Sequence, residues 1–155
     1  METSKKIFLF NIDSIIRQST NQRKLIIDAE DVELRMFARR RLVKLSYMGY
    51  TLVGFSIQPD LETHYRYEPN LFRQGVKSMQ RKLGPGKLHQ YFLSTQSTKH
   101  NIDDKIIYEL KSQLNIKSVL LIADDGRDLD LSNHIGAESV WSTKFFAELD
   151  QLSII

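Results

Sequence analysis

The sequence predicts an α/β fold, a three-layer α/β/α sandwich around a mostly parallel, Rossmann-like sheet. Short apolar runs alternate with amphipathic stretches about five times. The runs at 7–10 and 117–122 have the continuous apolar character of strands that are buried on both faces. Connections long enough to hold a helix favour parallel pairing of the strands, with helices on both faces of the sheet.

The N-terminal half contains the first two strands, a flap and a helix. The run at 7–10 predicts the first strand, and apolar pairs around a polar centre predict a hairpin flap at 14–28. Leu34, Phe37 and Leu45 mark one side of a helix expected at 31–48. Gly49 stands where a helix C-terminal cap belongs, and the second strand is expected at 50–55.

The C-terminal half alternates more regularly. Phe72, Val76 and Met79 recur at helical spacing and define the buried face of a helix at 70–83. This helix ends at the Gly84-Pro-Gly86 turn. The same periodicities predict strands at 90–94, 117–122 and 138–141, and helices at 103–114, 128–135 and 143–152.

Composition excludes several classes of protein. The chain has no cysteine, which rules out disulfides, thiolate metal sites and a cysteine nucleophile. No apolar run approaches the ~20 residues that a bilayer requires, and the first residues make a poor signal peptide. We therefore expect a cytoplasmic protein with no membrane partner. A length of 155 residues and 41% apolar residues fit one domain with an ordinary core.

Charge is distributed unevenly along the chain, although the formal net charge is only +3. Residues 69–90 hold five basic side chains and no acidic one, whereas residues 124–130 hold four aspartates and one arginine. Ligands of parallel α/β sheets bind beyond the carboxyl ends of the strands. The polar residues expected at those ends are Asn11, Asp13, Ser56, Lys99, Asp124 and Asp128.

These strand ends resemble the four motifs of the haloacid dehalogenase-like (HAD) phosphohydrolases. The stretch from Phe8 to Ile15 is similar to an apolar strand followed by D-x-D-G-T, and 52–58 to a strand ending in Ser or Thr. Lys99 fits the spacing of the third-motif lysine. Residues 119–128, followed by Gly136, are similar to a strand with G-D-x-x-x-D and a short helix. The resemblance implies one HAD-like domain over 1–155 without a substantial cap, similar to polynucleotide and histidinol-phosphate phosphatase domains.

The resemblance also implies a phosphate-monoester hydrolase that uses Mg²⁺. Asp13 would be the general acid/base, Ser56 would hydrogen-bond the phosphate and Lys99 would neutralise its charge. The residues at the implied metal site are Asn11, Asp13, Asp124 and Asp128. Each has a simpler alternative role, because Asp13 could cap a turn and the two later aspartates could complement a helix dipole.

Asn11 occupies the position of the nucleophile, where the family has aspartate. A neutral amide cannot form an aspartyl-phosphate, and it removes one negative charge from the metal site. Ser14, Ile15 and Ile57 are further departures from the family pattern. Three explanations stay open: a pseudophosphatase that binds without turnover and has lost Mg²⁺, an active enzyme in which aspartate was changed to trap substrate, or catalysis by another route.

Two surfaces are candidates for partner binding. Arg73, Lys77 and Arg81 lie four residues apart, off the apolar face of their helix, and could follow a nucleic-acid backbone or be an ordinary solvated face. We also expect a phosphorylated ligand. The apolar C-terminal tail would dock on the sheet or contact a second copy or a partner. The tail residues are Phe145, Phe146, Leu149, Leu152, Ile154 and Ile155.

Overall fold

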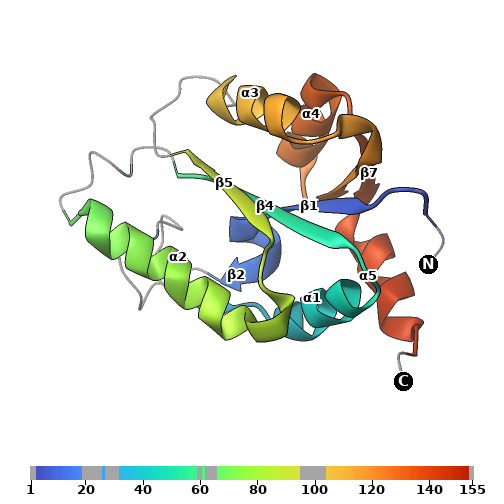
Figure 1. Ribbon diagram of the computed structural model, residues 1–155, viewed down its shortest axis with the longest axis horizontal. Coiled ribbons are helices and arrows are strands. Elements are labelled where there is room, and N and C mark those ends of the chain that lie inside the picture. The colour runs from blue at the N-terminus through green and yellow to red at the C-terminus, as the bar shows by residue number, and fades with distance from the viewer. Residues whose placement is uncertain are drawn as a thin grey trace.

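A single parallel sheet of five strands forms the centre of the structure (Figure 1). The computed structural model describes residues 3–18, 26, 32–58, 61, 66–94 and 104–153. The strand order is β5-β4-β1-β6-β7, and every neighbouring pair is parallel. The α/β fold class predicted from the sequence is confirmed. The strands are β1 Ile7–Asn11, β4 Thr51–Ile57, β5 Gln90–Ser94, β6 Val119–Ala123 and β7 Glu138–Trp141.

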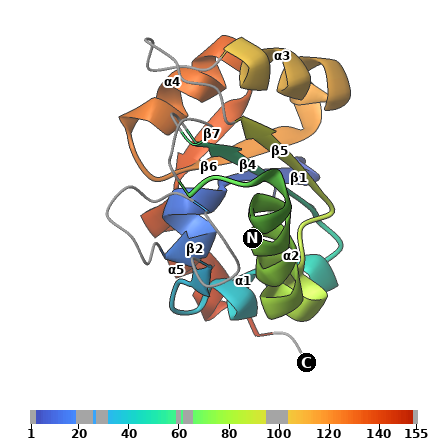
Figure 2. The ribbon, with the colours of Figure 1, turned by 90° about the vertical axis from the view of Figure 1, so that its left-hand side faces the viewer.

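Helices cover both faces of the sheet, which gives the three layers (Figures 1 and 2). One face carries α1 (Ala38–Tyr47), α2 (Pro69–Leu83) and α5 (Ser142–Gln151), and the other carries α3 (Asp104–Gln113) and α4 (Gly126–Ile135). Two hydrophobic cores lie between these layers. Strand alternation sends neighbouring side chains to opposite cores.

The register places the carboxyl ends of three strands together. Phe10 of β1 lies beside Gly54 of β4 and Ile122 of β6, so the residues that follow these three positions meet at one edge of the sheet. Phe8 and Phe10 point into the core under α1, α2 and α5, and Leu9 points into the other core. Gly54 has no room for a side chain, because an added Cβ would lie 2.6 Å from Leu88 Cδ1.

The segment before α1 differs from the sequence prediction. Glu33–Leu34 forms a short strand, β3, that pairs antiparallel with β2 (Arg17–Gln18). The prediction that this helix begins at residue 31 is therefore wrong, because α1 begins at Ala38. Phe37 precedes it with a φ of 69°, a left-handed conformation that interrupts any helix. The apolar spacing continued across this break, which is why periodicity misplaced the start. Residues 19–25 and 27–28 of the hairpin flap predicted at 14–28 lie outside the described residues; among the described ones, β2 pairs with β3.

Most of the apolar C-terminal tail packs into the chain's own core. Phe145, Phe146 and Leu149 are buried, and the ring of Phe145 lies edge-on to Phe8 at 5.1 Å between centroids. Leu152 packs against the same cluster. A contact of this tail with a second copy or a partner stays a prediction; 154–155 lie outside the described residues. In the part of the chain that the structure describes, no helix is long and apolar enough to cross a membrane.

Candidate functional site

The candidate site begins where β1 leaves the sheet. Directly after Asn11 the backbone makes one π-helical turn, Ile12–Ile16 (η1). The Asn11 side chain caps this turn, since its Oδ1 accepts from the Asp13 amide at 3.1 Å. Ile12, Ile15 and Ile16 are buried, and they fix the turn against the core. The turn thereby aims Asp13 across the end of β4.

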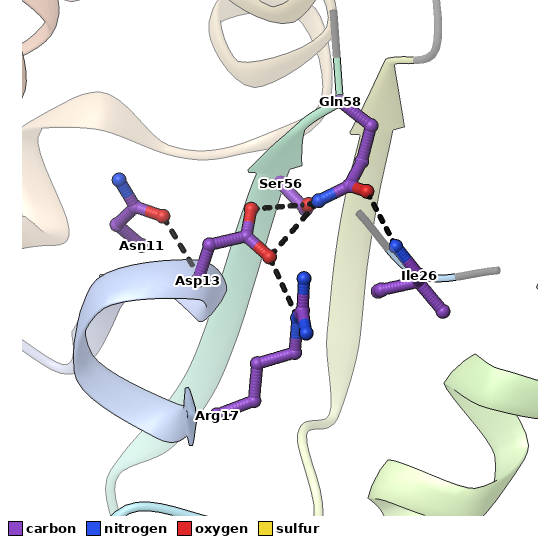
Figure 3. A network of polar contacts seen from close by, with 6 residues as sticks. All are labelled: Asn11, Asp13, Arg17, Ile26, Ser56 and Gln58. Carbon is purple, nitrogen blue, oxygen red and sulfur yellow. Dashed lines mark hydrogen bonds and ion pairs between the residues drawn. The ribbon is translucent and has the colours of Figure 1, made fainter. Parts of the chain in front are cut away.

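The Asp13 carboxylate is held by three side chains from three positions of the chain (Figure 3). Arg17 Nε donates to Oδ1 at 2.9 Å, and Gln58 Nε2 donates to the same oxygen at 3.0 Å. Ser56 Oγ donates to Oδ2 at 2.6 Å. Gln58 Oε1 in turn accepts from the amide of Ile26 at 2.9 Å. We name Asp13, Arg17, Ser56 and Gln58 the Asp13 cluster.

The Asp13 cluster contains a buried ion pair, formed by Asp13 and Arg17. The Arg17 side chain is 0% exposed and that of Asp13 is 13% exposed. Burial raises the pKa of Asp13 above its ordinary value, and the Arg17 charge and the hydrogen bonds from Ser56, Arg17 and Gln58 offset this only in part. A raised pKa suits a general acid, but geometry comes first. Both oxygens of Asp13 already accept hydrogen bonds from within the protein.

A second group of polar residues lies on the β6 side of Asn11. Asp128 is 1% exposed; its Oδ1 accepts from Asn11 Nδ2 at 3.2 Å and its Oδ2 from the Asp124 amide at 2.8 Å. Burial raises the pKa of Asp128, and these two hydrogen bonds oppose the shift. Asp125 caps α4 through bonds from the amides of Arg127 and Asp128. The exposed Asp124 carboxylate accepts from Ser142 Oγ at 3.1 Å.

The four residues at the implied metal site fit a resident Mg²⁺ poorly. The ion prefers carboxylate oxygens in octahedral geometry, and here Asp13 is paired with Arg17 and Asp128 is buried against Asn11. Asn11 itself contributes no charge. Asp124 is thus the one exposed carboxylate among the four implied ligands. Among the described residues, no group of three or more His, Cys, Asp or Glu side chains is placed to hold a metal.

The structure brings most of the sequence candidates together. Hydrogen bonds join Asn11 to Asp128, Asp13 to Ser56, and the Asp124 backbone to Asp128. Lys99 lies outside the described residues. Sequence reasoning missed two members of the site, Arg17 and Gln58. Signals for them existed: an arginine follows the apolar pair Ile15-Ile16 four residues after Asp13, and Gln58 directly follows the strand that carries Ser56.

Comparison with solved structures identifies the fold as that of HAD-like phosphatases. The D,D-heptose 1,7-bisphosphate phosphatase of B. bronchiseptica, solved with magnesium and phosphate, has a TM-score of 0.72 at 13% identity, over 92% of this chain and 86% of that one. The same phosphatase from Burkholderia thailandensis has a TM-score of 0.60 at 14% identity, over 93% and 85%.

A chain of the Pnkp1/Rnl/Hen1 complex has the same fold, with a TM-score of 0.61 at 13% identity; the match covers 90% of this chain and 47% of that chain. No protein-family model matches the sequence, and the search of curated proteins found no match. At these identities the similarity defines the fold alone. The function has to be argued from the site.

Proposed function

We propose that this chain is a phosphatase-fold protein that does not hydrolyse phosphomonoesters and acts by binding. The observation that carries the proposal is the buried ion pair between Asp13 and Arg17. A general acid/base must pass a proton to the leaving group and take one from water. Asp13 instead has both oxygens occupied, and Ser56, the residue that would hold the phosphate, donates its hydroxyl proton to Asp13. Asn11 cannot replace the missing nucleophile.

The loss of a resident Mg²⁺ belongs to the same proposal. A metal at this position would neutralise phosphate charge in an active phosphatase. In this chain the charge of Asp13 is balanced by Arg17, and Asp128 is held by the neutral amide of Asn11. We therefore expect the purified protein to bind Mg²⁺ no more tightly than a matched variant in which Asp124 is changed to Asn, as measured by calorimetry.

Phosphate release from a panel of phosphomonoesters tests the catalytic part. The panel includes 3′- and 5′-phosphorylated oligonucleotides with Mg²⁺. The proteins compared are the unchanged sequence, the Asn11→Asp variant, and the double variant Asn11→Asp with Arg17→Met. Asn11→Ala is the matched control, since it also removes the amide that holds Asp128. We expect no turnover above the Asn11→Ala background for the natural sequence or Asn11→Asp. Turnover by Asn11→Asp alone would contradict the proposal and favour an otherwise intact site with a trapped nucleophile.

A second candidate function is contact with single-stranded nucleic acid through α2. The supporting observation is a hollow of about 560 Å³ that Lys77, Arg81, Lys87 and Tyr91 line, with no acidic residue among the lining side chains. Tyr91 is 40% exposed, so its ring is available for stacking on a base. Arg73 continues the exposed basic stripe along the same helix. Cations beside an exposed aromatic ring suit a phosphate backbone with unpaired bases.

Fluorescence anisotropy with labelled single-stranded oligonucleotides tests this second function. We expect Lys77→Gln with Arg81→Gln to weaken binding and to reduce the slope of log K against log salt by about 2, one unit for each lost phosphate contact. Lys105→Gln with Lys111→Gln on α3 removes the same charge elsewhere and should leave the slope unchanged. Equal effects of the two double variants would overturn the assignment to α2.

A further inference from the structure

A groove beside α5 lies outside the Asp13 cluster. It has a volume of about 650 Å³, within the range of small-molecule sites, and runs between the η1–β2 segment and α5. Ser14 and Gln18 line it from one side, Arg35 from the segment after β3, and Thr143 and Ala147 from α5. These elements lie on one side of the sheet (Figure 2).

Two residues that line this groove each carry a buried polar atom without a hydrogen-bond partner. Arg35 Nε and Ser14 Oγ are both closed to solvent and unpartnered among the described residues. A buried donor without an acceptor is destabilising, more so in a charged group, and native proteins rarely tolerate it without a reason. The Arg35 backbone is fixed here, because its amide donates to Ile16 O at 2.9 Å. The fold thus holds the backbone of Arg35 against η1, the turn that carries Ser14.

The other cation of the groove, Arg41, is matched, whereas the exposed carboxylate Asp124 has a neutral hydroxyl as its partner. Arg41 forms a two-point ion pair with Asp150, at 3.1 and 2.7 Å, and Asp124 accepts from Ser142. Arg35 makes no ion pair within the part of the chain that the structure describes. Among the described residues, the groove is therefore lined by one cation without an ion pair, Arg35, and one carboxylate without an ion pair, Asp124.

We propose that Arg35 and Ser14 form an oxyanion-binding subsite, which takes a phosphate or carboxylate group of a small ligand seated in the groove. A guanidinium donates two parallel hydrogen bonds to such a group, and the serine hydroxyl donates a third. Both atoms are closed to a water-sized probe, so a ligand oxygen reaches them only when the two side chains turn toward the groove, and binding then satisfies both atoms. Ile15 and Phe146, which also line the groove, offer an apolar surface to the rest of the ligand.

This subsite is separate from the proposed loss of catalysis and does not depend on it. The Asp13 cluster is satisfied internally, whereas the donors of the groove lack acceptors. It is also separate from the hollow on α2, which shares no lining residue with the groove. A negative result in the groove would leave both proposals of the preceding subsection unchanged.

Titration of the ¹⁵N-labelled full chain with inorganic phosphate, and in a second arm with acetate, tests the subsite by NMR. We expect saturable amide shifts centred on Ser14, Met36 and Thr143. Arg35→Gln should weaken the affinity by about tenfold or more, because it removes the charge-assisted hydrogen bonds to the anion. Arg127→Gln removes one exposed arginine that does not line the groove and is the matched control. A response to phosphate alone identifies a phosphate ligand, and a response to both anions identifies a general oxyanion site.

The stability of the free protein gives a second readout, which a merely structural arginine would not produce. Replacing an unsatisfied buried donor with an apolar side chain of similar length should raise the thermal unfolding midpoint, so Arg35→Met should be more stable than the natural sequence without anion. Added phosphate should stabilise the natural sequence and not Arg35→Met. The proposal is overturned if no shifts localise to the groove, if Arg35→Gln binds as the natural sequence does, or if Arg35→Met lowers the midpoint.

Discussion

Removing Arg17 should destabilise the protein more than removing a surface arginine or lysine. Arg17 is 0% exposed and its Nε lies 2.9 Å from Asp13 Oδ1, so Arg17→Met leaves a buried carboxylate without its counter-charge. Breaking a buried pair by removing one partner costs about 3–5 kcal/mol, a large part of the 5–15 kcal/mol that stabilises a typical domain. Ser56 and Gln58 still donate to Asp13, which places the expected loss toward the lower end.

Urea unfolding followed by circular dichroism measures the effect. With a slope of about 2 kcal/mol per molar, a loss of 3–4 kcal/mol lowers the unfolding midpoint by about 1.5–2 M. Lys105→Met is the control for a solvent-exposed pair: Lys105 lies 4.0 Å from Glu109 on α3, and such a pair contributes only about 0.3–0.5 kcal/mol.

A second variant keeps the test sharp if Arg17→Met unfolds altogether. Arg17→Met combined with Asp13→Leu removes both charges, and replacing a buried pair by apolar residues is often neutral. We expect this double variant to recover most of the lost stability. The reasoning is refuted if Arg17→Met falls within about 1 kcal/mol of the natural sequence, or if the double variant is less stable than the single one.

Three further outcomes follow from the same geometry. Asn11→Asp places a carboxylate beside Asp128 Oδ1, now 3.2 Å from the amide, and should cost about 1–3 kcal/mol in urea unfolding, with no rescue by Mg²⁺. Burial raises the folded-state pKa of Asp13 and of Asp128 above the ordinary value of 3.8. The stabilisation that results from these shifts is complete below pH 3.8 and is lost as the pH rises through the folded-state pKa values. Titration followed by ¹³C NMR should place both midpoints above 3.8. Gly86→Ala should cost about 1–3 kcal/mol in thermal unfolding, because the new Cβ would lie 2.7 Å from Val43 N.

The sheet could be predicted because its central strands β1 and β6 are short apolar runs and the other strands alternate with amphipathic helices. The predicted ranges 90–94 and 138–141 coincide with β5 and β7, and the remaining strands differ from their predictions by one or two residues at an end. Helix α4 begins at Gly126, two residues before the prediction, because Asp125 caps it through two backbone amides. Periodicity does not detect a cap that precedes the apolar pattern.

The site could be predicted only as a set of strand ends. The rule that ligands bind at those ends located Asn11, Asp13 and Ser56 at one edge of the sheet, but it assigns no partner to a side chain. The ion pair with Arg17 depends on the π-helical turn η1, which aims Asp13 toward β4 and returns the chain in β2. A turn of this kind has no apolar period of its own, so nothing in the sequence pattern indicated that Asp13 would be enclosed.

The charges of the site explain why restoring one residue should not restore an enzyme. With aspartate at position 11, three acids would lie at the end of β1, the other two being Asp124 and Asp128, and an external cation would have to balance them. The chain instead has a neutral Asn11, which donates to Asp128, and an internal cation, Arg17, which pairs with Asp13. Asn11→Asp adds a negative charge without freeing Asp13 from its ion pair with Arg17. Under the proposed function, Asn11 and Arg17 together prevent catalysis. Only the variant that combines Asn11→Asp with Arg17→Met tests whether the remaining residues can form a phosphatase site.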